Sequence, residues 1–261
     1  MSGAVHARAE GAIGWLVLDN PARRNALSQA MWRGIGTGLD VLEADPDVRV
    51  IVLRGAGVEA FAAGADISEF ETLRADAAAA RAYAAVSDAA QERLYRCPKP
   101  TIAMIHGFCI GGGMGLALDC DLRVAGESAR FGVPAARLGL GYPAKHIARL
   151  VDVVGHAQAR EIFFTARHYA AEEALRIGLA NRLVPDDALE AEVRALAEGI
   201  AANAPVTIGA VKAILLELAR IDGPADAARC TALYDACFDS ADYAEGRRAF
   251  MEKRRPVFRG A

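Results

Sequence analysis

The stretch GFCIGGGMG, residues 107–115, places five glycines directly after an apolar run at residues 101–106. An apolar, β-branched run that gives way to glycines is typical of a strand ending in a tight turn, and residues 114–118 then favour a helix. Because the first N–H groups of a helix have no acceptor within it, and because glycine lets another molecule approach closely, this turn is predicted to bind a ligand oxygen.

A second turn of the same kind is FAAGAD, residues 61–66, which also follows an apolar run. Small residues in both turns leave backbone N–H groups uncovered. Two such turns converging on one substrate oxygen would form an oxyanion hole, in which fixed donors stabilise developing negative charge.

Strands and helices alternate through the first half of the chain. Strands are predicted at residues 13–19, 48–54, 101–106, 121–124 and 129–132, and helices at residues 28–43 and 75–94. Ser28 is the expected N-cap of the first helix. This alternation indicates an α/β fold with largely parallel strand pairing.

Helical patterns fill the remainder. They cover residues 142–153, 157–165, 170–177, 190–203, 205–220, 226–240 and 241–254. An all-helical tail cannot complete a sheet, so it is expected to pack on the core or on another subunit. We therefore divide the chain into a core with the ligand site, residues 1–198, and a helical oligomerisation region, residues 199–261.

Composition excludes several classes of function. The 261 residues carry a net charge of −3 without a run of basic residues, which disfavours nucleic-acid binding and membrane-surface binding. No window resembles a signal peptide or a spanning helix, and five scattered cysteines show no metal-ligand spacing. We expect a cytoplasmic protein with reduced thiols and no metal.

Ordered motifs along most of the chain resemble the enoyl-CoA hydratase/isomerase, or crotonase, superfamily. They are NPARRNALS (20–28), FAAGADI (61–67), KPTIAMIHGFCIGGG (99–113), CDLRVA (120–125), ARFGVPAARLGLGYP (129–143), GLANRLVP (178–185) and FMEKRRPVF (250–258). The resemblance implies a crotonase-like spiral of ββα units with a C-terminal helical trimerisation region. A homotrimer or a dimer of trimers is therefore expected.

The same resemblance implies an acyl-CoA thioester as substrate, with coenzyme A part of the substrate and no separate cofactor. The donors to the thioester carbonyl would be the N–H groups of Ala65 and Gly112. A fixed donor to a thioester enolate is worth about 3 kcal/mol or more.

Coenzyme A contacts follow from the matched motifs. Residues expected at the adenine are Ala63, Asp66 and Ile67; those expected near the phosphates and pantetheine are Arg23, Arg24 and Ala26; and those expected from the C-terminal region, sometimes of a neighbouring subunit, are Phe250 and Lys253. The two arginines could equally be solvated surface residues, and Phe250 could equally be a core residue.

The chain departs from the family where its hydratases carry two glutamates. The matching positions are Gly115 and Ala135. Hydration needs water to be deprotonated and a proton to be delivered, and neither residue can do either. A conventional hydratase is therefore disfavoured, as is a double-bond isomerase. A dehalogenase is disfavoured because Pro143 stands near the place of its nucleophilic aspartate.

Tyr142 favours a further branch, since the superfamily's methylmalonyl-CoA decarboxylase has a tyrosine at the matching place. Decarboxylation or C–C/thioester cleavage is thus favoured, with Tyr142 as a catalytic candidate or else as a buried ring. The alternatives are an enoyl-CoA hydratase with a non-standard water-activating residue and a non-catalytic acyl-CoA-binding member. Asp119 and His146 are weaker candidates; Asp119 could instead bond to local backbone, and His146 could be an ordinary helix residue.

Overall fold

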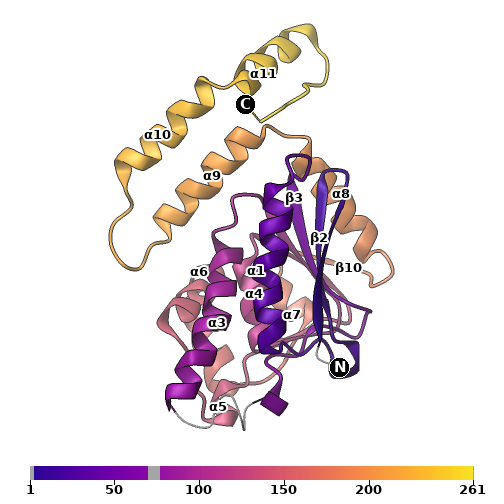
Figure 1. The fold of residues 1–261 in the computed structure, drawn as a ribbon, viewed down its shortest axis with the longest axis vertical. Coiled ribbons are helices and arrows are strands. Elements are labelled where there is room, and N and C mark those ends of the chain that lie inside the picture. The colour runs from indigo at the N-terminus through magenta and orange to yellow at the C-terminus, as the bar shows by residue number, and fades with distance from the viewer. Residues whose placement is uncertain (1–2, 70–76, 261) are drawn as a thin grey trace.

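A six-stranded sheet forms the centre of the chain in the computed structural model, which describes residues 3–69 and 77–260 (Figure 1). Its strand order is β1-β2-β3-β5-β7-β10. The bounds are β1 Ala4–Glu10, β2 Ile13–Asp19, β3 Val50–Gly55, β5 Thr101–Ile105, β7 Leu122–Gly126 and β10 Arg182–Val184. All neighbours are parallel except β1 and β2, which form an antiparallel hairpin.

Four short strands, which alternate along the chain with those of the central sheet, form a second, smaller sheet. It has the order β4-β6-β8-β9, with β4 at Ala60–Ala62, β6 at Phe108–Ile110, β8 at Arg130–Gly132 and β9 at Tyr169–Ala170. Strands β4 and β6 are parallel, with Ala62 opposite Cys109. Strands β3, β5 and β7 are each followed by a short strand and then by helix, and the predicted α/β fold of ββα units is confirmed.

Helices cover both faces of the central sheet. The helices of the core are α1 Gln29–Ala44, α3 Ala77–Tyr95, α4 Gly112–Asp119, α5 Ala135–Leu138, α6 Ala144–Thr165, α7 Ala171–Arg176 and α8 Leu189–Ala201. Helices α1, α3, α4 and α6 lie on one side and α8 on the other (Figure 1). Burial on both faces explains why β3 is continuously apolar, with Val50 and Val52 packed on the α8 side and Ile51 and Leu53 in the opposite core.

Three C-terminal helices project from this core. They are α9 Pro205–Leu218, α10 Ala227–Phe238 and α11 Ala241–Glu252, and they stand beyond the amino ends of the central strands (Figure 1). The expected boundary at residue 199 falls in the last turn of α8. The helical tail is confirmed, while its role in oligomerisation stays a prediction.

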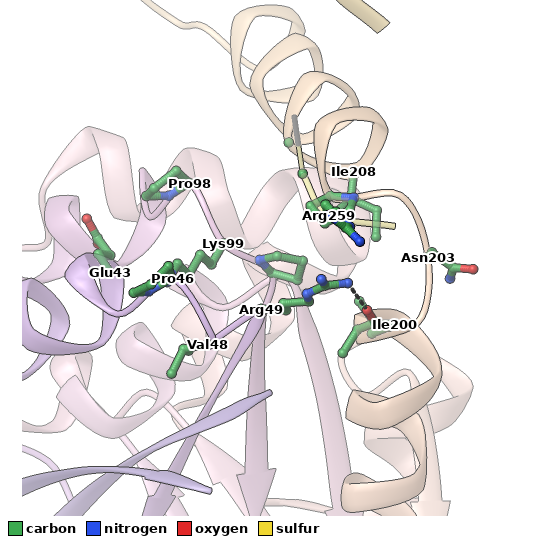
Figure 2. Close-up of a pocket in the computed structure, with 15 residues that line it drawn as sticks. Glu43, Pro46, Val48, Arg49, Pro98, Lys99, Ile200, Asn203, Ile208 and Arg259 are labelled. Atoms are coloured by element: carbon green, nitrogen blue, oxygen red, sulfur yellow. Dashed lines mark hydrogen bonds between the residues drawn. The ribbon is translucent and has the colours of Figure 1, made fainter. Parts of the chain in front are cut away.

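Arg49 and Lys212 fasten the projecting region to the core. Arg49 donates to the carbonyls of Ala201, at 3.1 Å, and Phe258, at 2.7 Å, beside a cavity of about 310 Å³ (Figure 2). Lys212 donates to Lys99 O and to the Asp121 carboxylate, at 2.7 Å. This cavity opens at the amino ends of β3 and β5, whereas ligands of parallel sheets bind at the carboxyl ends.

Several local predictions can be compared with the structure. Ser28 caps α1 by accepting from Met31 N, as expected. The helix expected at residues 75–94 is α3, its first two residues lying outside the described ranges. The helix expected to begin at Tyr142 begins instead at Ala144, after Pro143, and continues through a non-helical Gly155 (φ 75°) between the two predicted segments. The sequence prediction missed β1.

Within the part of the chain that the structure describes, no single helix is long and apolar enough to cross a membrane. Helices α8 and α9 meet that criterion only when taken together, and they are bent by 103°.

Candidate active site

The two glycine turns lie against each other at the carboxyl ends of the strands. A Cβ placed on Gly111 would lie 3.9 Å from Gly64 Cα, and one placed on Gly113 would lie 2.2 Å from Ala62 O. Gly64 has a φ of 107°, a conformation that L side chains rarely adopt. Glycine at these places therefore allows the backbone of one turn to touch that of the other.

The N–H groups of Ala65 and Gly112 are the free donors of this contact. Across residues 3–69 and 77–260 neither has a hydrogen-bond acceptor, while the neighbouring Asp66 N–H donates to Leu27 O at 2.9 Å. Gly112 is the first residue of α4, so its N–H points out of the helix. Both residues are partly exposed. The geometry supports the predicted pair of donors.

Apolar side chains hold the Gly112 turn in place. A Cβ on Gly112 would lie 3.2 Å from the Trp32 ring and 3.6 Å from Leu27. Leu27 also donates its N–H to Gly64 O at 2.7 Å, so one residue braces both turns. A rigid turn keeps donors oriented without reorganisation during a reaction.

Gly115 and Ala135, where the resemblance predicts the glutamates of the family's hydratases, lie close to the two turns. Gly115 lies one turn into α4 and Ala135 begins α5, and both are buried. Space beside Gly115 is occupied by Gln91 of α3, whose Oε1 lies 2.7 Å from an ideal Gly115 Cβ. A neutral amide thus takes the room of a side chain at position 115.

Tyr142 packs between two aromatic rings. Its ring contacts Phe163 edge-on, with centroids 5.0 Å apart, and His146 at 6.2 Å. Burial, followed by the Asp119 carboxylate, raises the pKa of the Tyr142 hydroxyl. That hydroxyl has no hydrogen-bond partner among the described residues. It is therefore a protonated donor at neutral pH.

A buried ionic cluster lies behind Gly115. Arg149 donates to the carboxylates of both Asp119 and Glu92. The partner of Asp119 is the Arg149 guanidinium from α6 rather than local backbone. Burial is the largest effect on Asp119 and, despite Arg149, raises its pKa to about 7. Its Oδ2 has no partner in the described part of the chain.

His146 belongs to a second ionic pair beside that cluster. Its Nε2 lies 3.1 Å from Asp88 Oδ1, and the other Asp88 oxygen lies 3.1 Å from Lys145 Nζ. Burial lowers the pKa of His146, although Asp88 opposes this. His146 is accordingly neutral near pH 7. It links α6 to α3 through its contact with Asp88, which is a structural role.

The residues expected around coenzyme A are brought together by the 3-10 turn η1, Pro21–Arg23. Arg23 binds the Asp66 carboxylate at 2.7 Å, and Ala63 N donates to Arg24 O at 2.9 Å. Burial opposes ionisation of Asp66, but hydrogen bonds from Ser68 and Arg23 outweigh it and lower the pKa. Ala26 donates its N–H to Arg23 O, and Ile67 is exposed at the start of η2, Ile67–Glu69.

A sequence profile described as enoyl-CoA hydratase/isomerase matches residues 8–261. The chain belongs to the enoyl-CoA hydratase/isomerase family. It is 40% identical to a putative enoyl-CoA hydratase of Thermus thermophilus over 95% of this chain and 98% of that protein. It is 33% identical to a short-chain-enoyl-CoA hydratase of Clostridium acetobutylicum over 94% of each.

Solved structures of the same family superpose closely on this chain. An enoyl-CoA hydratase/carnithine racemase from Magnetospirillum magneticum superposes with a TM-score of 0.93 and 42% identity, covering 100% of this chain and 97% of that one. A putative enoyl-CoA hydratase/isomerase family protein from Hyphomonas neptunium gives a TM-score of 0.93 and 40% identity over 97% of each chain. The enoyl-CoA hydratase/isomerase family thus accounts for the whole described fold.

Two of the residues expected to contact coenzyme A lie far from the others. Phe250 is 81% exposed on α11, and Lys253 follows that helix. Helix α11 is at the opposite end of the molecule from α5, which begins at the site (Figure 1). One chain does not bring these two residues to Gly112, so their expected role requires a neighbouring subunit.

The sequence prediction missed Gln91 and the partners of Asp119 and His146. Gln91 stands in an alanine-rich helix without a motif, and nothing in the sequence shows that α3 faces Gly115. Among the described residues no group of three His, Cys, Asp or Glu side chains could hold a metal ion.

Proposed function

We propose that this enoyl-CoA hydratase/isomerase family enzyme acts on acyl-CoA thioesters by forming an enolate without a general base, with decarboxylation favoured over C–C or thioester cleavage. The observation that carries the proposal is the pair of unpaired N–H groups at Ala65 and Gly112 beside positions 115 and 135, which have no carboxylate. Enolate stabilisation is retained while acid–base groups of hydration are absent.

Decarboxylation needs only the parts that this site has. In a thioester with a β-carboxylate, the bond from Cα to the carboxylate carbon breaks and CO2 leaves. Its electron pair forms the enolate, whose oxygen accepts from the two N–H groups. Cα then takes a proton, for which the Tyr142 hydroxyl is the candidate donor, and solvent returns that proton to tyrosine. The products are CO2 and the shortened acyl-CoA.

A glutamate at position 115 or 135 would oppose such a substrate, because like charges repel strongly in a site with little water. The neutral Gln91 amide beside Gly115 does not.

Enoyl-CoA hydration is the second candidate, since several relatives carry that name. It would require a water activated by a residue other than 115 or 135. Asp119, whose pKa is raised to about 7 and whose Oδ2 has no partner among the described residues, is the candidate in the ionic cluster behind Gly115.

A three-substrate assay tests these alternatives. Purified enzyme is supplied with malonyl-type thioesters, crotonyl-CoA and saturated acyl-CoA, and CO2, hydrated product and free CoA are quantified. We expect CO2 release to exceed hydration. Crotonyl-CoA turnover on the order of 10 s⁻¹ or more would overturn the proposal, because that is an ordinary enzymatic rate. Tight binding of all three without turnover would indicate a non-catalytic acyl-CoA-binding protein.

We also propose a homotrimer or dimer of trimers, built through residues 199–261. A groove of about 630 Å³ between α9, α10 and α11 is lined mainly by apolar side chains, including Val211, Ile214 and Phe238. Leu215, Leu218 and Phe250 are large apolar residues exposed on the same three helices. Apolar surface of this extent typically marks an interface.

A further inference from the structure

The strongest unassigned feature is the side chain of Gln91, which enters the active site from a helix that carries no site motif. It is 7% exposed, and its Oε1 lies 2.7 Å from the ideal Gly115 Cβ. Real Cβ atoms are essentially never approached that closely. Glycine at 115 and glutamine at 91 therefore depend on each other: the amide occupies the room that the absence of a side chain provides.

The amide is held loosely where it lies. Its one hydrogen bond in the described structure runs from Nε2 to Ser87 O at 3.4 Å, the outer limit for such a bond. Oε1 accepts none. The two ends of a glutamine amide have nearly the same shape, and hydrogen bonds decide which end faces a given group. Rotation of the amide loses only this long contact, so either the oxygen or the NH2 group can face the space beside Gly115.

The charged groups around Gln91 are already paired. On α3, Asp88 binds Lys145 and His146 of α6, and Glu92 binds Arg149. Arg149 also binds Asp119 of α4, the helix that carries Gly115. Neither Lys145 nor Arg149 is thus left unpaired for a ligand in this space. The polar group left to meet it is the Gln91 amide.

We propose that Gln91 is a specificity-determining residue, whose side-chain NH2 donates to a carboxylate on the acyl group and so selects carboxylate-bearing thioesters over neutral ones. This inference rests on the proposed function and names its substrate class. A neutral donor suits a carboxylate that must later leave as CO2, because an ion pair with lysine or arginine would stabilise the charge in the ground state.

Equilibrium binding of two stable CoA amides, in which nitrogen replaces the thioester sulfur, tests the proposal without turnover. One carries a malonyl group and the other a butyryl group of similar length. Calorimetry of the wild type should give at least tenfold tighter binding of the malonyl amide. Gln91→Leu should bring the ratio near one, and Gln91→Glu should invert it through charge repulsion.

Gly115→Ala provides a test that leaves Gln91 in the chain. Its methyl group would displace the amide, which is the end of a flexible side chain, so the protein should fold while losing the same preference. Adding Gln91→Leu to Gly115→Ala should then change the ratio no further. Gln158→Glu, on the second half of α6, is the matched control and should retain the wild-type ratio.

The outcomes separate this inference from the proposed function. If the wild type binds neither CoA amide, the acyl-CoA assignment itself fails. If both amides bind and the Gln91 and Gly115 variants keep the wild-type ratio, Gln91 does not select the substrate, while the proposed reaction is still decided by the CO2 assay. If those variants bind the malonyl amide more weakly but the butyryl amide as before, the result supports both the role of Gln91 and the proposed substrate class.

Discussion

Arg23 Nη1 lies 2.7 Å from both carboxylate oxygens of Asp66, which joins the turn before α1 to the residue that follows the Ala65 donor. The pair thereby fixes the outer rim of the first glycine turn. It also places positive charge where the resemblance predicts the phosphates of coenzyme A.

Arg23→Ala should raise KM for an acyl-CoA about tenfold and change kcat little, because the lost contacts bind substrate and transition state alike. The free energy of unfolding should change by less than about 1 kcal/mol, since the arginine is half exposed. Steady-state kinetics and urea unfolding measure both. Arg8→Ala removes another surface ion pair, to Glu10, and should leave KM unchanged; equal effects of the two variants would contradict a specific role.

Asp119→Asn should stabilise the protein more at pH 8 than at pH 5. The pKa of Asp119 is raised to about 7, above its unfolded value, so between about pH 4 and 7 the folded state holds a proton that the unfolded state has lost. Wild-type stability from this group therefore falls as pH rises through that window.

The difference between the two proteins should grow by up to about 3 kcal/mol from pH 5 to 8, because about two pH units of that range lie below the folded pKa and each contributes about 1.4 kcal/mol. Urea unfolding at both pH values measures it, and Glu92 still binds Arg149 in the variant. The other carboxylates titrate in the same way in both proteins, so their contributions cancel in the difference between the two free energies of unfolding. A pH-independent difference would show that Asp119 is ionised throughout.

Tyr142→Phe should lower kcat for CO2 release about 100-fold while KM stays within about twofold, as expected when a proton donor is removed. Stability should change by less than about 0.5 kcal/mol, because the hydroxyl has no partner in the described structure. Tyr234→Phe, on α10, removes a hydroxyl away from the site and should be neutral. An unchanged kcat would remove Tyr142 from the mechanism.

Leu215→Asp should convert the assembly into monomers, since a charge would then lie on the exposed apolar surface of α9 that is proposed to be covered by another subunit. Light scattering after size-exclusion chromatography measures the mass. Phe164→Asp changes an even more exposed apolar residue of α6, outside residues 199–261, and should keep the wild-type mass. A monomeric wild type would refute the proposed assembly.

Sequence patterns predicted the helices that bury one face and the strands that bury both faces. The strands after residues 13, 50 and 101 are buried on both faces and read as apolar runs, and the α1 N-cap at Ser28 follows from side-chain chemistry. The strand β1 was missed because AVHARAE is an exposed edge strand that mixes small and charged residues. Short strands such as β4 are defined by their neighbours rather than by propensity.

The candidate donors were chosen from the sequence by what it says about the backbone, and their role stays a prediction. Ala65 and Gly112 lie in motifs whose small residues indicate that one backbone segment approaches another, or a ligand, closely. Gln91, by contrast, acts through a side chain from an alanine-rich helix, and its position depends on how α3 docks against α4. The Arg149 contact with Asp119 likewise depends on the docking of α6, which no local pattern encodes.

The register of β4 against β6 has a consequence for the two donors. Ala62 lies opposite Cys109, and each donor follows three residues later, at 65 and 112. The two turns also contact each other through main-chain atoms beyond that rung, since an ideal Cβ on Gly64 would lie 3.2 Å from Ile110 O and 3.8 Å from Gly112 N. The separation of the donors is thus a property of main-chain pairing, so side chains around the pocket can be exchanged, and the reaction changed, while the distance between the donors is conserved.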